Sequence, residues 1–233
     1  MKKVAIMQPY FFPYIGYFQL INGVDQFVVY DNIQYTKKGW VTRNRFLQNG
    51  KDALFSLPIK ASSNFLDIRD KRISSDFSHD KFLNRMREAY RCAPIFELVF
   101  PLLERIVRQD ESNLFNYLFN SVKEVCRYLA VDTEIVVSSD LPVDHCLPGK
   151  DRVLAICQHL GADVYVNPIG GQSLYMKAEF AARGVGLKFL QSTNRPYRQF
   201  NDEFVPWLSI IDVMMFNPLP EMRSRLASDY ELI

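Results

Sequence analysis

The densest chemical segment of the chain is residues 36–45, TKKGWVTRNR. It places four cations, an indole and an asparagine within ten residues. A guanidinium holds a phosphate or carboxylate through two parallel hydrogen bonds, in one fixed orientation that a lysine does not impose. Trp40 can stack on a base or a sugar ring. The segment therefore predicts a site for a phosphorylated small molecule, with Arg43 or Arg45 on the phosphate. A solvated basic loop is the alternative interpretation.

Polar side chains also follow the short apolar runs of the chain. Gln8 follows the run at residues 4–7, and Asp31 follows the run at residues 27–30. Asn167 follows a third such run. Ligands of an open parallel sheet bind beyond the carboxyl ends of its strands. These side chains are therefore expected to line the same cleft as the arginines.

No arrangement typical of a nucleophilic or metal-dependent enzyme stands out. His145 and Cys146 are adjacent in sequence, and neighbouring side chains usually point apart, which argues against a Cys-His dyad. The four cysteines form no CxxC pair and match no zinc pattern. We therefore expect no disulfide and no metal site, as in a protein of the reducing cytosol.

Short apolar runs alternate with helical patterns at both ends of the chain. Strands are expected at residues 4–7, 27–30, 53–59, 133–137, 162–166 and 185–190, and helices at residues 14–22, 80–90, 95–108, 112–129, 149–160, 174–183 and 206–216. The first 30 residues form a βαβ unit, whose strands are parallel. A hairpin turn is possible at Asn49–Gly50.

These elements predict an α/β fold, with a mostly parallel sheet and helices on both of its faces. We expect a single domain over residues 1–233, with a helical insert or cap at about residues 80–130. A cap over an open sheet is a common way to exclude water from a site.

Composition limits the partners of the protein. The formal net charge is +2, which argues against a nucleic acid or an anionic membrane as partner. No apolar run approaches the ~20 residues of a membrane span. The N-terminal apolar run ends at Gln8–Pro9, too early for a signal peptide. A cytoplasmic protein is therefore expected.

Residues 8–18, QPYFFPYIGYF, resemble the opening of the WbqC-like family, whose members typically begin with a strand, a QPxYxPxxGYF-like stretch and a helix. The resemblance covers essentially the whole chain, through Asp31, Gln34–Tyr35, residues 43–45, 165–175, 196–199 and 204–212. Many members carry a histidine just before the Gln-Pro pair, where this chain has Met7. A mechanism that uses that histidine is therefore not expected here.

The resemblance implies an enzyme of bacterial surface-polysaccharide (O-antigen) sugar biosynthesis. The implied reaction is transfer of an acyl or aminoacyl group, such as glycyl, to the amine of a nucleotide-linked amino sugar. A thioester of coenzyme A or of a carrier protein would be the donor. In this reaction Asp31 would accept the proton of the amine, and Asn44 would polarise the acyl carbonyl. The expected substrate-binding residues are Gln8, Tyr10, Tyr14, Gln34, Tyr35, Trp40, Arg43, Arg45, Asn167, Gly170, Tyr197 and Gln199.

Two other classes of function remain open from the sequence. One is a nucleotide-binding α/β ligase that activates a carboxylate with ATP, although such enzymes usually show a histidine-rich loop after the first strand. This chain has no histidine before His79. The other is a non-catalytic saccharide-binding protein, in which loss of Asp31 would weaken only binding.

Overall fold

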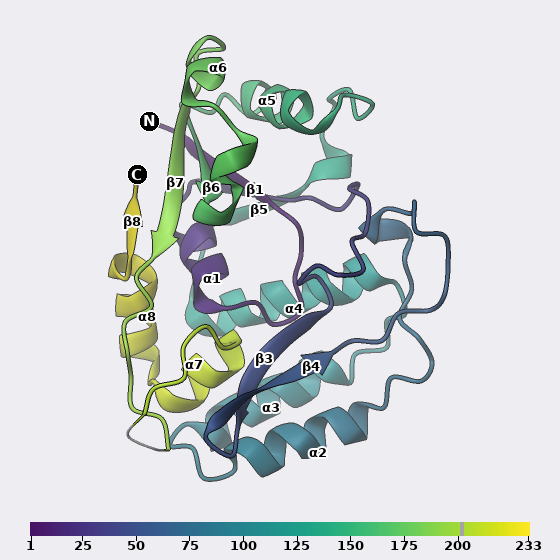
Figure 1. Cartoon of the computed structure of the whole chain (residues 1–233), viewed down its shortest axis with the longest axis vertical. Coiled ribbons are helices and arrows are strands. Elements are labelled where there is room, and N and C mark those ends of the chain that lie inside the picture. The colour runs from purple at the N-terminus through teal and green to yellow at the C-terminus, as the bar shows by residue number, and fades with distance from the viewer. Residues whose placement is uncertain (201–202) are drawn as a thin grey trace.

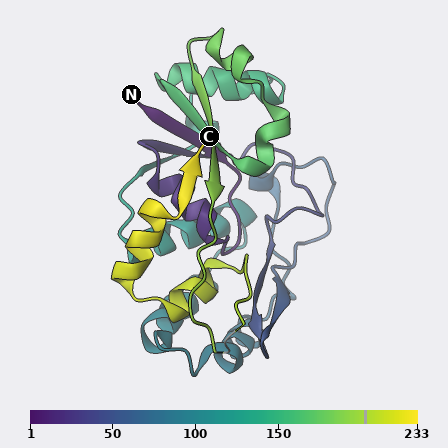
Figure 2. The ribbon, with the colours of Figure 1, turned by 60° about the vertical axis from the view of Figure 1, so that its left-hand side comes forward.

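The computed structural model of the chain describes residues 1–200 and 203–233. Within them, a six-stranded sheet has the order β5-β2-β1-β6-β7-β8 (Figure 1). Its strands are β1 (Lys3–Met7), β2 (Gln26–Val29), β5 (Glu134–Val137), β6 (Val164–Pro168), β7 (Gly186–Ser192) and β8 (Tyr230–Leu232). The first five are parallel, whereas β8 runs antiparallel beside β7 (Figure 2). The predicted mostly parallel α/β fold is confirmed.

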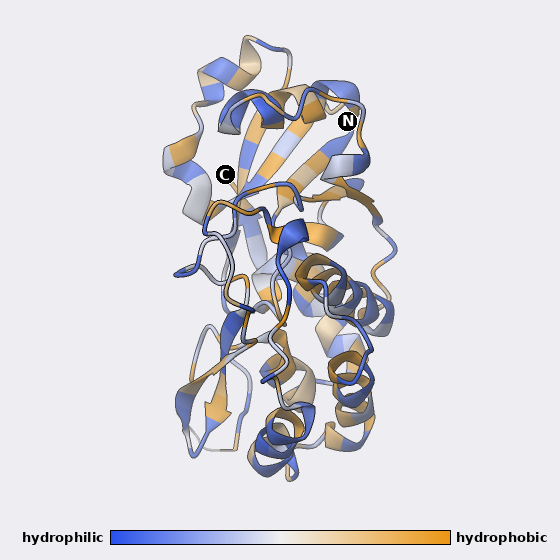
Figure 3. Cartoon of the chain, turned by 90° about the vertical axis from the view of Figure 1, so that its right-hand side faces the viewer, coloured by the Kyte–Doolittle hydropathy of each residue, from blue (hydrophilic) through white to orange (hydrophobic). Residues whose placement is uncertain are grey.

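The central strands are buried on both faces, which explains their uninterrupted apolar runs. Because successive side chains of a strand point to opposite faces, neighbours enter different cores. Ala5 and Phe27 enter the core on one face, and Val4, Ile6 and Val28 enter the core on the other. In Figure 3, the strands of this sheet carry hydrophobic segments broken by hydrophilic ones, and both colours also occur along the helices.

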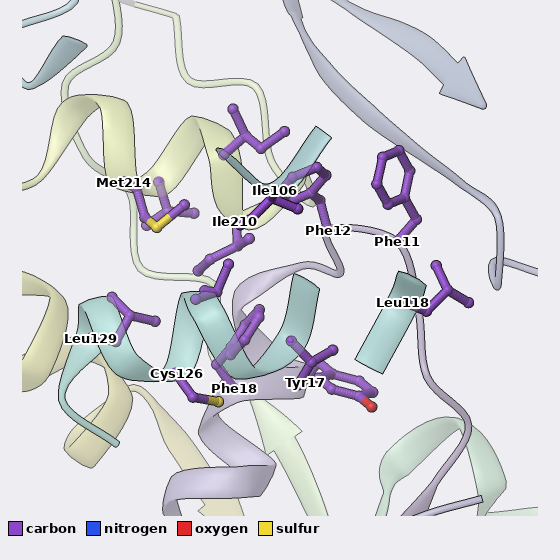
Figure 4. Packing of buried hydrophobic residues seen from close by; sticks show 14 of the residues in the cluster. Phe11, Phe12, Tyr17, Phe18, Ile106, Leu118, Cys126, Leu129, Ile210 and Met214 are labelled. Atoms are coloured by element: carbon purple, nitrogen blue, oxygen red, sulfur yellow. The ribbon is translucent and has the colours of Figure 1, made fainter. Parts of the chain in front are cut away.

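Helices cover both faces of the sheet, as expected. The first core contains side chains of α1 (Ile15–Asn22), α7 (Ile210–Phe216) and α8 (Leu219–Ser228), and the second contains those of α5 (Gly149–His159) and α6 (Lys177–Ala181). The predicted central helices are α2 (His79–Tyr90), α3 (Phe96–Val107) and α4 (Leu114–Leu129), and they extend the first core (Figure 4).

A hairpin of β3 (Arg43–Gln48) and β4 (Lys51–Ser56) stands apart from this sheet (Figure 1). Asn49 and Gly50 both have positive φ, 53° and 73°, which is the requirement of a tight two-residue hairpin turn. The turn was predicted, but β3 was not. Its polar and charged residues show no alternation of hydrophobic and hydrophilic types, although buried and half-buried side chains alternate along most of the strand. The strand expected at residues 53–59 instead begins at Lys51 and ends at Ser56.

Near the C-terminus, two expected helices differ from the structure, and two elements were not predicted. The helix expected at residues 174–183 is a 3-10 helix (Ile169–Leu174) followed by the short α6, because Tyr175 takes an extended conformation. The helix expected at residues 206–216 begins only at Ile210, where Ser209 Oγ caps it by accepting from Ile211 N. Helix α8 and strand β8 were not predicted, since α8 is charge-rich and the three residues of β8 depend on pairing with β7.

A buried carboxylate joins the C-terminal half of the chain to the hairpin. Asp212 Oδ1 accepts a hydrogen bond from Tyr90 Oη (2.8 Å), and its Oδ2 accepts from Tyr197 Oη (2.6 Å) and Gln199 Nε2 (2.8 Å). Tyr90 Oη in turn accepts from Leu47 N (2.9 Å) in β3. Burial raises the pKa of Asp212 to about 6, against the opposing effect of these three donors.

This pKa makes stability depend on pH. The folded protein binds a proton at Asp212 with a pKa of about 6, and the unfolded chain binds it near 3.8. The fold should therefore gain stability as pH falls from about 6 to about 4, by about 3 kcal/mol from this group. We expect Asp212→Asn to remove that gain. Urea unfolding of both proteins between pH 4 and pH 7 measures it, and parallel pH profiles would contradict the assignment.

Candidate functional site

The loop at residues 8–14 leads from β1 to α1 and is fixed at one carbonyl. Phe12 has a φ of 44°, in the left-handed region. Its carbonyl oxygen accepts hydrogen bonds from Asn44 Nδ2 (2.8 Å) and from Ser209 Oγ (2.7 Å). Ser209 N also donates to Arg45 O (2.8 Å). The loop, the hairpin and the start of α7 are therefore held together at Phe12.

Two adjoining chambers lie around this loop. The sheet chamber, of about 460 Å³, is lined by Ile6, Met7, Gln8, Tyr10, Tyr30, Ile33, Trp40, Val153, Tyr165, Asn167, Pro168, Gly170, Gly171, Leu174 and Tyr175. The hairpin chamber, of about 440 Å³, is lined by Tyr10, Pro13, Tyr14, Trp40, Asn44, Arg45, Ile169, Gly170 and Trp207. Tyr10, Trp40 and Gly170 line both chambers, so the two meet there.

The sheet chamber offers neutral hydrogen-bonding groups at the carboxyl ends of β1, β2 and β6. Asn167 is only 6% exposed, and its Oδ1 accepts from Tyr165 Oη (3.1 Å). A Cβ added at Gly171 would lie 2.0 Å from Asn167 Nδ2, so only glycine admits the carboxamide in this position. The buried hydroxyl of Tyr30 has no hydrogen-bond partner among residues 1–200 and 203–233, and Gln8 lines the same wall.

Burial keeps the phenols of both chambers neutral. It raises the pKa of Tyr10 to about 12, and it also raises the pKa values of Tyr14, Tyr30, Tyr165 and Tyr175. These hydroxyls can donate and accept hydrogen bonds near neutral pH, but they do not act there as phenolate bases.

The hairpin chamber adds a positive charge. The guanidinium carbon of Arg45 lies 5.2 Å from the ring centroid of Trp40. Arg45 Nη1 also lies 3.6 Å from Asp52 Oδ2 in an exposed ion pair, which solvent screens. Arg45 can therefore exchange this partner for an anionic ligand.

Arg43 has a different role from Arg45. Its guanidinium also lies near the Trp40 ring, at 5.3 Å, but it donates to the carbonyl oxygen of Lys38 and lines neither chamber. Arg43 thereby fixes the loop that carries Trp40.

The two side chains assigned to catalysis from the sequence make structural contacts. Asp31 is buried, its Oδ1 accepts from Ser139 N (3.0 Å), and it lines neither chamber. Asn44 lines the hairpin chamber, but its Nδ2 donates to Phe12 and its Oδ1 accepts from Arg45 N (2.8 Å). In the structure, Asp31 thus contacts the backbone at Ser139, and the Asn44 carboxamide contacts the backbone at Phe12 and Arg45.

Four other expected residues also lie outside the two chambers. Gln34 Nε2 donates to Asn64 O (2.9 Å), and Tyr35 lines a separate cavity of about 330 Å³. Tyr197 and Gln199 belong to the hydrogen-bond cluster of Asp212. The structure brings together the remaining expected residues, Gln8, Tyr10, Tyr14, Trp40, Asn44, Arg45, Asn167 and Gly170.

Tyr30 and Trp207 were not assigned to the site from the sequence. Tyr30 directly precedes Asp31, and the twofold alternation of an extended chain places these two neighbours on opposite sides. That alternation could have identified Tyr30. Trp207 carries no local signal, because its neighbours in the chamber come from distant segments.

The four cysteines differ in exposure: Cys126 and Cys157 are buried, whereas Cys92 and Cys146 are exposed. All four are free, and burial raises the pKa values of Cys126 and Cys157 to about 12, so both thiols stay protonated. Among residues 1–200 and 203–233, no group of three or more histidine, cysteine, aspartate or glutamate side chains is placed to hold a metal. No helix in the same residues is long and apolar enough to cross a membrane.

The sheet and the chambers at its strand ends define an open-sheet α/β protein with a candidate ligand groove. The model of the WbqC-like protein family matches residues 8–224, and the chain belongs to this family. A relative from Mycobacterium tuberculosis (strain ATCC 25618 / H37Rv), described as "Uncharacterized protein Rv1507c", is 29% identical over 221 residues. The match covers 93% of this chain and 94% of the relative. The comparison with solved structures gave no match.

The Phe12 contacts predict a structural role for Asn44. Asn44→Ala removes one of the two donors to the Phe12 carbonyl and should lower the free energy of unfolding by about 1–3 kcal/mol. Asn44→Asp should destabilise at least as much, because it turns a carboxylate oxygen toward that carbonyl. Ser209→Ala removes the other donor and serves as the matched variant. Unchanged urea midpoints in all three would contradict this role.

Proposed function

We propose that the protein binds a nucleotide-linked amino sugar across both chambers and acylates the amine of the sugar, as an enzyme of surface-polysaccharide biosynthesis. The observation that supports this ligand is the junction of two chambers of different chemistry at Tyr10, Trp40 and Gly170. The neutral sheet chamber suits a nucleoside, which Gln8 and Asn167 could bind through hydrogen bonds. The hairpin chamber suits a phosphorylated sugar, because Arg45 supplies a guanidinium there.

The proposed reaction balances without a strong base in the chambers. The neutral amine attacks the carbonyl carbon of an acyl or aminoacyl thioester, a C–N bond forms, and the C–S bond breaks. The thiolate of coenzyme A or of the carrier protein, released when the C–S bond breaks, takes the proton from nitrogen. The products are an amide and a thiol. Asp31, which lies outside the chambers, has no role in this scheme.

We also propose a cytoplasmic location, since nucleotide-linked sugars and acyl thioesters are made there. The free cysteines fit a reducing compartment.

A non-catalytic saccharide-binding protein is the second candidate. It is favoured by the chamber linings, which contain no carboxylate, imidazole or thiol among the described residues. Such a protein would bind the same ligand and release it unchanged.

A single set of incubations separates these functions. The protein is mixed with UDP-glucosamine and a panel of acyl and aminoacyl thioesters, and mass spectrometry follows the sugar. An acylated sugar supports the transferase. A ligand-dependent rise in melting temperature without product supports the binding protein. AMP formed from ATP and a free carboxylic acid would point to the ligase class instead. GDP- and dTDP-linked amino sugars extend the panel.

The junction of the chambers provides the first prediction about the ligand. A Cβ at Gly170 meets nothing within 4 Å, so Gly170→Val should fold normally while it narrows the passage. We expect at least about tenfold weaker binding of a nucleotide sugar that spans both chambers, with little change for the nucleoside alone. Gly149→Val is the matched control, because its Cβ is equally free of contacts and Gly149 lines neither chamber. Equal affinities in the two variants would place the ligand elsewhere.

The two arginines provide a second prediction. A charge-assisted hydrogen bond contributes about 1.5–3 kcal/mol, so Arg45→Lys should weaken nucleotide-sugar binding by about 10- to 150-fold. Arg43→Lys should lower the melting temperature and leave affinity nearly unchanged, because Arg43 binds a backbone carbonyl. Calorimetric titration and thermal unfolding of both variants measure these effects. The reverse pattern would assign the phosphate to Arg43.

A further inference from the structure

Trp207 lies on the wall of the hairpin chamber in a conformation that packing alone does not explain. Its φ is 60°, in the left-handed region that a bulky side chain rarely adopts. Its side chain is nevertheless 51% exposed, so the strain is not offset by burial in a core. Strained residues of this kind persist where the surrounding structure holds them, and they cluster at ligand sites.

The surrounding contacts hold Trp207 toward the chamber. Two residues later, Ser209 is fixed by its bonds to Arg45 O and Phe12 O. The indole packs against the ring of Tyr14, with centroids 6.1 Å apart and an interplanar angle of 61°. Tyr14 occupies its position because residue 16 is glycine, since an added Cβ there would lie 2.3 Å from Tyr14 Cε2.

We propose that the indole face of Trp207, braced by the ring of Tyr14, forms a platform for the sugar ring of the ligand. A pyranose presents C–H groups on its faces and hydroxyls at its edge, which suits a broad aromatic surface with an open rim. Arg45 lines the same chamber, where it would meet a phosphate on the anomeric carbon. The nucleotide part of this arrangement rests on the proposed function, whereas the platform requires only a saccharide ring.

The competing explanation is that Trp207 only fills space. It also borders a small cavity beside Tyr197 and Arg225, so its removal could affect folding alone. The two explanations differ in their expected effect on ligand affinity: removing the indole weakens binding only if Trp207 contacts the ligand.

The chain provides an intrinsic probe for the test. Its only two tryptophans, Trp40 and Trp207, both line the hairpin chamber. In Trp207→Gly and Trp207→Ala, the remaining emission therefore comes from Trp40 in the same chamber. We would titrate wild type and both variants with UDP-glucosamine, UDP and methyl glucosaminide, and measure tryptophan emission and, independently, calorimetric heat. Phe65→Ala, which removes a side chain 85% exposed and outside both chambers, is the control.

We expect both variants to bind UDP-glucosamine about 30-fold more weakly than wild type, with the same loss for methyl glucosaminide and little change for UDP. Glycine tolerates positive φ, whereas alanine does not, so Trp207→Gly should melt about 2–4 °C above Trp207→Ala. Loss of affinity in both variants, despite their different stabilities, identifies the indole as the cause.

Two results would overturn the platform. In one, wild type and the Trp207 variants bind UDP-glucosamine equally well, which leaves the proposed function intact. In the other, wild type binds neither sugar compound. If wild type binds methyl glucosaminide through Trp207 but no nucleotide sugar, the platform stands and the proposed nucleotide ligand fails.

Discussion

The carbonyl of Phe12 is the point on which the geometry of the groove depends. The left-handed conformation of Phe12 would be unfavourable in an isolated loop. Hydrogen bonds from Asn44 and Ser209 stabilise it, and the buried Phe12 ring anchors it in the first core. One donor comes from the hairpin and the other from the start of α7. The Phe12 carbonyl therefore fixes both of these segments, and each contributes to the wall of the hairpin chamber.

The chemistry of the chambers follows from burial. Five tyrosines line them, and burial keeps their phenols neutral, so they provide shape and hydrogen bonds without charge. Arg45 is the one charged side chain among the described lining residues. The charge of the two chambers is therefore concentrated at Arg45, on the wall of the hairpin chamber. Burial disfavours the charged form of Asp212, which lies outside the chambers and joins Tyr90, Tyr197 and Gln199 through hydrogen bonds.

The sequence predicted those site residues whose position follows from the strand that they end or follow. Gln8 and Asn167 follow apolar strands of a parallel sheet, so the position of strand ends places them in one chamber. The same rule did not distinguish Asp31 from its neighbour Tyr30. Neighbouring side chains of an extended chain point in opposite directions, and here Tyr30 lines the sheet chamber, whereas Asp31 contacts Ser139 N. Arg43 and Arg45 looked equivalent in sequence, yet only Arg45 lines a chamber.

The sequence by itself determined the class of fold, the parallel order of its first strands, the hairpin turn at Asn49–Gly50 and the family. These depend on hydrophobic periodicity and on the φ preferences of a few residues, both of which are local. Tertiary structure decided that Asn44 holds Phe12, that Asp212 gathers two tyrosines and a glutamine, and that Trp207 faces Tyr14. The residues joined by each of these contacts lie between 13 and 193 positions apart in the sequence. No local pattern encodes such contacts, since they form only when separate elements pack together.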